Sequence, residues 1–154
     1  MELRRVRLND PEVTPLLHGL RSEYERRYGQ GDELGAVPAH EFELPDGAFL
    51  IVLEGGKTVA GGALRRLSSQ TCEVKRMWTA PDQRRKGYAS IVLDALETVA
   101  EELGYTTVRL ETGWAQPEAH SLYRNRGYHQ IPTYGSYERA TAFECRLVDR
   151  VDKP

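Results

Sequence analysis

The stretch Arg84-Arg85-Lys86-Gly87-Tyr88-Ala89 decides the fold, because it joins a β-like segment to a long amphipathic helix. The β-like segment runs from Glu73 to Thr79, and the helix is expected to begin near Ser90. A glycine-bearing turn at such a junction leaves amide N–H groups unpaired, and the helix dipole adds partial positive charge there. Three basic side chains add full charges. The turn is therefore predicted to bind an anion, most naturally a phosphate group of a ligand.

Size and composition set the class of protein. The chain has 154 residues, which suits a single domain over residues 1–154 with one hydrophobic core. A net charge of −2 argues against nucleic acid or an acidic membrane as partner. The longest apolar run, Ala48 to Leu53, is far shorter than the ~20 residues that span a bilayer. The N-terminus lacks the apolar region of a signal peptide, so we expect a cytoplasmic protein.

The two cysteines, Cys72 and Cys145, lie in strand-like segments and suit a reducing compartment. We interpret both as small buried thiols. A disulfide or a catalytic thiol is the weaker alternative, because neither cysteine has a CxxC or Cys–His context.

Hydrophobic periodicity predicts an α+β fold. The front half indicates an antiparallel meander, and the back half alternates helices with strands. The predicted strands are 2–8, 48–54, 58–67, 72–79, 106–111, 128–131 and 141–148, and the predicted helices are 11–28, 90–103 and 115–126. Strand, helix and strand over 73–111 imply a parallel pair with a right-handed crossover. Together, these elements predict a mixed sheet with helices on both faces.

Two motifs now give the chain a family resemblance. Arg84-x-x-Gly87-x-Ala89 resembles the phosphate motif of the GNAT superfamily of N-acetyltransferases, Gln/Arg-x-x-Gly-x-Gly/Ala. Leu122-Tyr123-x-x-x-Gly127-Tyr128 resembles the family's signature on the helix after the fifth strand. The order of elements also agrees from residue 2 to about 148. The resemblance implies acetyl-CoA as cofactor, coenzyme A as product, and a mostly antiparallel central sheet splayed at its parallel strand pair.

The resemblance also implies where the cofactor binds. Amides around Gly87 and Ala89 would hold the pyrophosphate, and main-chain groups of Met77 and Thr79 would pair with the pantetheine arm like an added strand. Gln116 stands where the family commonly has an asparagine, and it keeps the amide on a longer side chain. The predicted cofactor-binding residues are Met77, Trp78, Thr79, Arg84, Arg85, Lys86, Gly87, Tyr88, Ala89, Ser90, Gln116 and Tyr123.

Tyr123 is the candidate catalytic acid. It shares one helix face with Gln116 and Ala119, and the resemblance places that face along the cofactor's arm. A phenol has a pKa of about 10 and a thiol about 8.5, so full proton transfer to the thiolate is uphill by about 2 kcal/mol. We therefore expect a hydrogen bond that stabilises the leaving sulfur. The alternative is a tyrosine packed in the core.

Glu73 is the candidate base. It lies eleven residues before Arg84, the offset of the general base in the histone-acetylating branch of the family. A lysine-like amine has a pKa of about 10.4, so freeing it at neutral pH costs about 4.6 kcal/mol. Strand alternation puts Glu73, Lys75 and Met77 on one face. A neighbouring Lys75 would make the carboxylate a weaker base. A direct base, a water-relayed base, no base and a structural ion pair all remain open.

The acceptor site is predicted from the family's layout. Tyrosines and basic residues around a small pocket suit a small amine that also carries a carboxylate or phosphate. The alternative is that these are surface residues. The candidates are Tyr24, Tyr28, Arg65, Lys75, Tyr134 and Tyr137. The four histidines lack metal-ligand spacing, so no metal site is predicted.

The predicted function is acetyl transfer from acetyl-CoA to the primary amine of a small molecule, directly in a ternary complex. No suitably placed nucleophile for a covalent intermediate is visible. Two alternatives stay open: an enzyme acting on protein lysines or N-termini, and a non-catalytic acyl-CoA-binding sensor. The sequence leaves open a longer acyl donor in place of acetyl, and both a monomer and a homodimer.

Overall fold

The computed structural model describes residues 1–28, 37–113, 117–135 and 140–150. These residues form a mixed sheet with the strand order β1-β2-β3-β4-β5-β7-β6. Its strands are β1 (Glu2–Val6), β2 (Ala48–Glu54), β3 (Lys57–Arg66), β4 (Thr71–Thr79), β5 (Thr107–Gly113), β6 (His129–Ile131) and β7 (Ala140–Arg146). The helices are α1 (Thr14–Tyr28), α2 (Tyr88–Glu102) and α3 (Pro117–Asn125), with short 3-10 helices at Pro11–Val13, Ala39–Phe42, Pro81–Gln83 and Leu147–Asp149.

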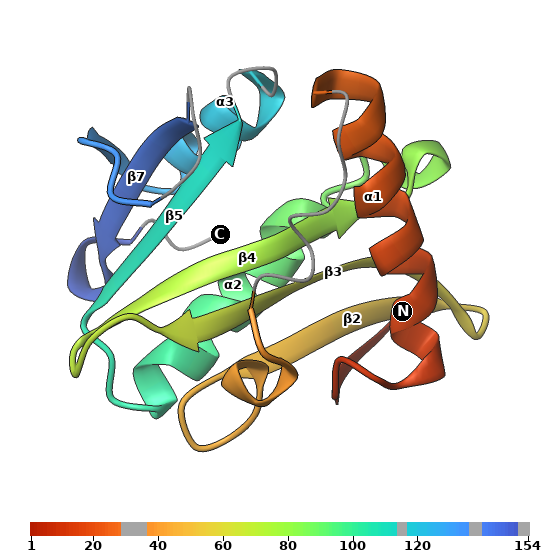
Figure 1. Ribbon diagram of the computed structural model, residues 1–154, viewed down its shortest axis with the longest axis horizontal. Helices are drawn as coiled ribbons and strands as arrows, with labels where there is room; N and C mark the ends of the chain where they lie inside the picture. The colour runs from red at the N-terminus through yellow and green to blue at the C-terminus, as the bar shows by residue number, and fades with distance from the viewer. Residues whose placement is uncertain (29–36, 114–116, 136–139, 151–154) are drawn as a thin grey trace.

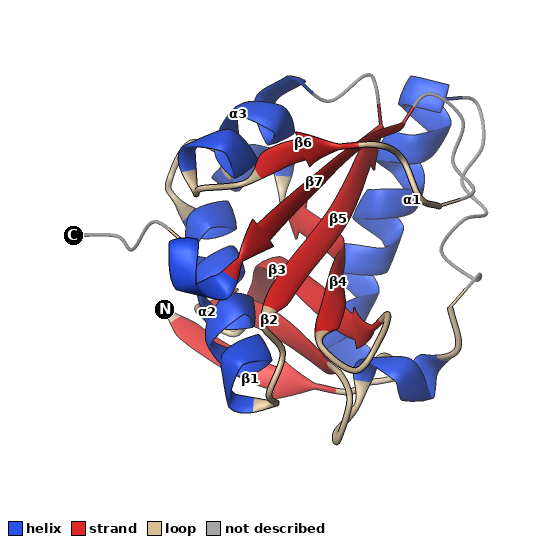
Figure 2. Ribbon diagram, turned by 90° about the vertical axis from the view of Figure 1, so that its left-hand side faces the viewer, coloured by secondary structure: helices blue, strands red, loops and turns tan. Residues whose placement is uncertain are grey.

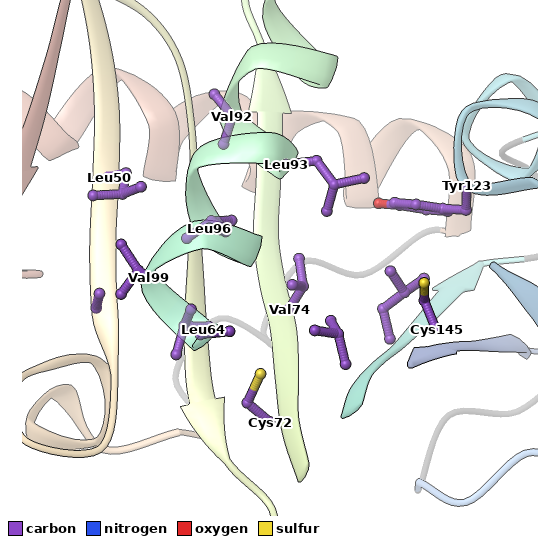
Figure 3. Packing of buried hydrophobic residues seen from close by; sticks show 14 of the residues in the cluster. Leu50, Leu64, Cys72, Val74, Val92, Leu93, Leu96, Val99, Tyr123 and Cys145 are labelled. Atoms are coloured by element: carbon purple, nitrogen blue, oxygen red, sulfur yellow. The ribbon is translucent and has the colours of Figure 1, made fainter. Parts of the chain in front are cut away.

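Helices cover both faces of the sheet, with α1 on one side and α2 and α3 on the other (Figure 2). Under α2, apolar side chains of the helix pack on side chains of β2, β3 and β4 (Figure 3). Leu93 and Leu96 are fully buried there, as the broad apolar stripe of the predicted helix requires. A second cluster lies under α1 and includes Leu16, Phe49 and Trp78.

The sheet divides between β4 and β5. These strands pair in parallel only from Thr71 to Glu73, opposite Thr107 to Arg109, whereas the other neighbouring strands are antiparallel. Beyond that point they diverge, and the C-terminal end of α1 and helix α3 stand on either side of the opening (Figure 1). The predicted fold class is confirmed: a mixed, mostly antiparallel sheet, splayed at its parallel pair and with helices on both faces.

A β-bulge interrupts β4 next to this opening. Gly61 of β3 lies opposite Trp78, while Ala63 lies opposite Lys75, so β4 carries one extra residue between these pairs. Arg76 adopts a φ of 62°, a left-handed conformation unusual for a residue with a side chain. Bulges of this kind bend a strand and redirect the side chains that follow.

The bulge makes the expected alternation along β4 wrong. Met77 packs with Val74 in the cluster under α2, on the face opposite to Glu73. Trp78 instead packs in the cluster under α1, where its indole faces Gly19 so closely that any Cβ at that glycine would collide with the ring. Because of the extra residue, the side chains of β4 that follow the bulge lie on the face opposite to the one that strict alternation predicts.

Helix α2 begins at Tyr88, two residues earlier than predicted, directly after Gly87 with a φ of 85°. The Tyr88 side chain is buried, and its hydroxyl donates to Oε2 of Glu54 at 2.6 Å. Most other predicted elements are present with ends shifted by one or two residues.

Cys72 and Cys145 are free, buried thiols, and burial raises their pKa to about 12 and about 11. Among the described residues, no helix combines the length and apolar character needed to cross a bilayer.

Candidate active site

A cleft of about 660 Å³ occupies the opening between β4 and β5. It is lined by the second half of β4, the basic turn, the start of α2, the end of β5, and side chains of α1 and α3. The cleft thus connects the predicted phosphate-binding turn with Tyr123 on α3 and Tyr24 on α1. Its position follows from the fold, because only the divergence of two parallel strands leaves backbone of a central strand accessible.

The turn before α2 forms one end of the cleft. Arg85, Gly87, Ala89 and Ser90 all line it. Arg85 and Gly87 have φ values of 64° and 85°, a tightly curved backbone at the helix start. The first amides of α2 have no acceptor within the helix, and the helix dipole makes this end positive. The geometry is that of an anion site at a helix N-terminus.

The three basic residues of the turn differ in their contacts. Arg84 lines the cleft, but its Nε donates to the carbonyl of Thr79 at 3.1 Å and its guanidinium pairs with Glu23 of α1. The Lys86 ammonium donates to Oε1 of Gln83 at 3.0 Å and lies outside the lining of the cleft. Arg85 lines the cleft and is exposed. The structure therefore places Arg85 most directly for charge contact with a bound anion.

The wall beyond the turn is formed by β4 and by the end of β5. All residues from Val74 to Thr79 line the cleft, including the predicted Met77 and Trp78. Thr112 of β5 also lines it, and its buried hydroxyl has no hydrogen-bond partner among the described residues. Buried polar groups are normally paired, so this hydroxyl fits a site completed by a polar ligand. The amides of a pantetheine arm are ligand groups of that kind.

Tyr123 is buried at 4% exposure and lines the cleft. Its ring centroid lies 5.7 Å from that of Tyr128 and 5.9 Å from that of Phe143. These contacts fix the ring, and the hydroxyl is directed toward Leu93 (Figure 3). Burial raises the pKa of Tyr123 well above its ordinary value of 10.0. The phenol is therefore a protonated hydrogen-bond donor at neutral pH.

Glu73 is almost fully buried, at 5% exposure, and does not line the cleft. Its Oε1 accepts from Nη1 of Arg65 at 3.1 Å and lies 3.7 Å from Nζ of Lys75. Its Oε2 accepts from the hydroxyl of Tyr134 at 2.8 Å. Arg65 also donates through Nε to Glu41 at 2.8 Å. Burial lowers the pKa of Lys75, an effect that Glu73 opposes.

The predicted acceptor residues thus fall into two groups. Tyr24 and Lys75 line the cleft, whereas Arg65 and Tyr134 lie behind it and bind Glu73. Four residues chosen for two separate roles, Glu73, Lys75, Arg65 and Tyr134, come together in one cluster. The remaining predicted residues lie where no side chain is described: Tyr28, Gln116 and Tyr137.

Sequence reasoning missed several charged residues of the cleft. Glu111 of β5, Arg76 at the bulge and Glu23 of α1 all line it. One signal was available for Glu111, because it lies near the carboxyl end of a strand predicted to be parallel to its neighbour, the edge where α/β sheets bind ligands. Arg76 carried no such signal, since the bulge that turns it is not visible in an alternating pattern.

Comparison with known proteins identifies the family. Residues 16–128 match the model of the "Acetyltransferase (GNAT) family". The chain belongs to the GNAT family of acetyltransferases. This chain is therefore an acyltransferase.

Individual relatives agree with this assignment. The Escherichia coli protein named "Uncharacterized N-acetyltransferase YjgM" is 31% identical over 142 residues, which cover 84% of this chain and 82% of that protein. A solved structure from Klebsiella pneumoniae has a TM-score of 0.79 and 25% identity, covering 95% of this chain and 97% of that one. PaiA N-acetyltransferase from Thermoplasma acidophilum, solved in complex with coenzyme A, has a TM-score of 0.71 and 16% identity over 95% and 99% of the two chains.

Proposed function

We propose that this GNAT protein transfers an acetyl group from acetyl-CoA to the primary amine of a small molecule, directly within a ternary complex. One observation carries the proposal: a single cleft joins the anion-binding turn at the start of α2 to the buried phenol of Tyr123. A donor with phosphates at one end and a reactive thioester at the other matches that layout. The family's relatives named as N-acetyltransferases support the same chemistry.

Main-chain groups of this chain would hold the donor. The amides around Gly87 and Ala89 are suited to the pyrophosphate, and the β4 backbone at Met77 and Thr79 is suited to the pantetheine arm. When bound, acetyl-CoA supplies an acetyl group activated as a thioester. The accessible β4 backbone, with its amides already oriented by the sheet, is also placed to polarise a carbonyl in the cleft.

Tyr123 would assist the departure of the sulfur. Its phenol remains protonated at neutral pH because burial raises its pKa. A donor with so high a pKa stabilises a thiolate by a hydrogen bond more readily than by early proton transfer. Its packing against Tyr128 and Phe143 holds the hydroxyl in one place.

Of the roles open to Glu73, the geometry favours the structural ion pair. Arg65 and Tyr134 occupy its two oxygens, Lys75 lies close by, and its side chain is shielded from the cleft. A general base needs to reach the proton it removes, directly or through one water. Glu73 would instead connect β3, β4 and the segment after β6.

A small acceptor with an anionic group fits the remaining part of the cleft. Lys75, Arg76 and Tyr24 all line the cleft, so its lining includes two positive side chains and a phenol. Cationic side chains in a partly buried site favour a carboxylate or phosphate on the ligand.

An acceptor panel tests the proposal. Release of free thiol from acetyl-CoA is followed with amino acids, small amines, aminoglycosides and lysine-containing peptides, with acetyl-CoA alone as control. The proposal predicts amine-dependent turnover with a small molecule. Turnover restricted to peptides would contradict the small-molecule acceptor, and tight cofactor binding without transfer to any amine would indicate the sensor alternative.

A further inference from the structure

Glu111 is the carboxylate that the cleft presents at the end of β5. It lines the cavity, whereas the buried Glu73 on the neighbouring strand does not. Glu73 is the last residue of β4 that pairs with β5, and Glu111 lies two residues beyond its partner Arg109, where the strands diverge. A group that handles the acceptor amine must be reachable from this space.

The segment before β7 holds Glu111 through the main chain. Its Oε2 accepts the N–H of Tyr134 at 3.3 Å and the N–H of Gly135 at 3.2 Å. A Cβ built on Gly135 would collide with Oε1 of Glu111, so the carboxylate lies directly against the glycine backbone. A side chain fixed through one oxygen by two amides has lost most of its rotamer freedom, which preorganises it for binding.

Tyr134 connects both carboxylates. Its main-chain N–H binds Glu111 on β5, and its hydroxyl donates to Glu73 on β4 at 2.8 Å. The guanidinium of Arg109 lies over its ring at 5.6 Å. Glu73 with its partners therefore anchors the residue that positions Glu111. Both oxygens of Glu73 accept hydrogen bonds, from Arg65 and from Tyr134, so this anchor is itself held in place.

We propose that Glu111 binds the ammonium group of the acceptor and removes its proton during transfer. This inference rests on the proposed N-acetyltransferase function and names the residue that faces the amine. The acceptor class is an amine that is protonated at neutral pH, whose N–H groups a carboxylate can accept.

The proposed step balances in atoms and charge. The ammonium first releases one proton to solvent through Glu111, which frees the nitrogen lone pair. The nitrogen then bonds to the acetyl carbon, and the carbon–sulfur bond breaks with its electron pair on sulfur. The second nitrogen proton passes to Glu111 and from there to solvent, which restores the carboxylate, and the thiolate, hydrogen-bonded by Tyr123, takes up one proton from solvent. The products are an N-acetyl amide, free coenzyme A and one released proton.

Glu111→Gln is the decisive variant, because an amide oxygen can still accept the two main-chain N–H groups. The probes are tyramine, glycine amide and lysine, each with acetyl-CoA. We expect kcat/KM for the fastest of these amines to fall about 10²-fold at pH 7, the loss typical of a missing general base. The KM for acetyl-CoA should not change. Glu102→Gln, an exposed carboxylate at the far end of α2, is the matched control and should behave as the wild type.

The pH profile separates catalysis from structure. Without its base the variant depends on amine that is already neutral. For an amine with a pKa of about 10, such as the lysine side chain, its log kcat/KM should rise by about one per pH unit between pH 7 and 9, while the wild type levels off. Wild-type activity in Glu111→Gln, or a parallel profile at a lower level, would overturn the inference. If the wild-type protein acetylates no small amine of the wider acceptor panel, the proposed function fails and this inference fails with it.

Discussion

Three properties of Tyr123 bear on its role. It is nearly fully buried, it packs between two aromatic rings, and it lines the cleft that the basic turn closes. The aromatic contacts come from the ring, whereas the proposed chemistry needs only the hydroxyl. Substitution with phenylalanine therefore separates the two roles.

Tyr123→Phe is predicted to reduce kcat about 10²-fold or more, because the thiolate loses its hydrogen-bond donor. The ring contacts remain, so the affinity for coenzyme A in calorimetry and the midpoint of thermal unfolding should stay close to the wild-type values. Steady-state kinetics on the best acceptor checks the prediction. Unchanged turnover would show that Tyr123 is a core residue, and loss of cofactor binding would show that its role is structural.

At the scale of single residues, the sequence predicted the types of side chain in the site better than their positions in the fold. Glu73 was a reasonable base by its spacing before the turn. Its partners Arg65 and Tyr134 are 8 and 61 residues away, so the burial that they cause is visible only after folding. Glu111 was missed for the same reason, since its role depends on main-chain groups 23 and 24 residues further along.

A buried polar cluster connects α2 with the chain that leaves α3. Glu97 of α2 is 1% exposed, and its Oε2 accepts from the Tyr128 hydroxyl at 2.7 Å. Arg126 donates to Glu97 at 3.3 Å and to Asp94 at 2.9 Å. Burial raises the pKa of Glu97, and these donors oppose that rise. The cluster fixes the end of α3, and with it the Tyr128 ring against which Tyr123 packs.

Glu97→Ala is predicted to lower the free energy of unfolding by roughly 3 kcal/mol, because it removes one of the two carboxylates that pair with the buried Arg126 and leaves the buried Tyr128 hydroxyl without its acceptor. Glu101→Ala, an exposed glutamate one turn further along α2, should stay within about 0.5 kcal/mol of the wild type. Urea unfolding of both variants measures the difference. Equal stabilities would mean that the cluster does not hold α2 and α3 together.

Helices and strands with a strong hydrophobic periodicity were predicted correctly, whereas an interruption within a strand was missed. The apolar run of β2 and the amphipathic pattern of α2 were recognised with nearly correct ends. The bulge at Arg76 was not, because an extra residue changes no composition and shows only in the register with β3. That bulge decides which faces Met77 and Trp78 occupy, and therefore shapes the cleft wall.

The whole molecule buries several groups that lose protons only at high pH. Burial raises the pKa of Cys72 from 9.0 to about 12 and that of Cys145 to about 11, and it also raises the pKa of Tyr123 and Tyr128. Between the unfolded and folded pKa values, the unfolded chain has released these protons and the native chain has kept them. Rising pH in that window therefore favours the unfolded state.

We predict that these groups cause no pH dependence of the unfolding free energy below about pH 8.5. From about pH 9 toward 12, the unfolding free energy should fall as the pH rises. Each group contributes a slope of up to about 1.4 kcal/mol per pH unit. In Cys72→Ala the slope of the unfolding free energy between pH 9 and 11 should be smaller by about the contribution of one group. Urea unfolding across this range measures it, and an identical slope in the variant would contradict the assignment.

Every functional statement depends on the binding of a diphosphate-containing donor at the start of α2. Gly87→Ala tests this contact, and Gly56→Ala in the β2–β3 turn is its matched control, since both glycines have positive φ values, 85° and 78°. The two substitutions bring similar backbone strain, but only the first places a Cβ at the cleft.

Isothermal titration calorimetry with coenzyme A and acetyl-CoA is the most direct measurement. The structure predicts one binding event per chain for the wild type and for Gly56→Ala, and at least about tenfold weaker binding for Gly87→Ala, a loss of about 1.4 kcal/mol or more. No binding of either compound to the folded wild-type protein, or equal affinity in both glycine variants, would contradict this account.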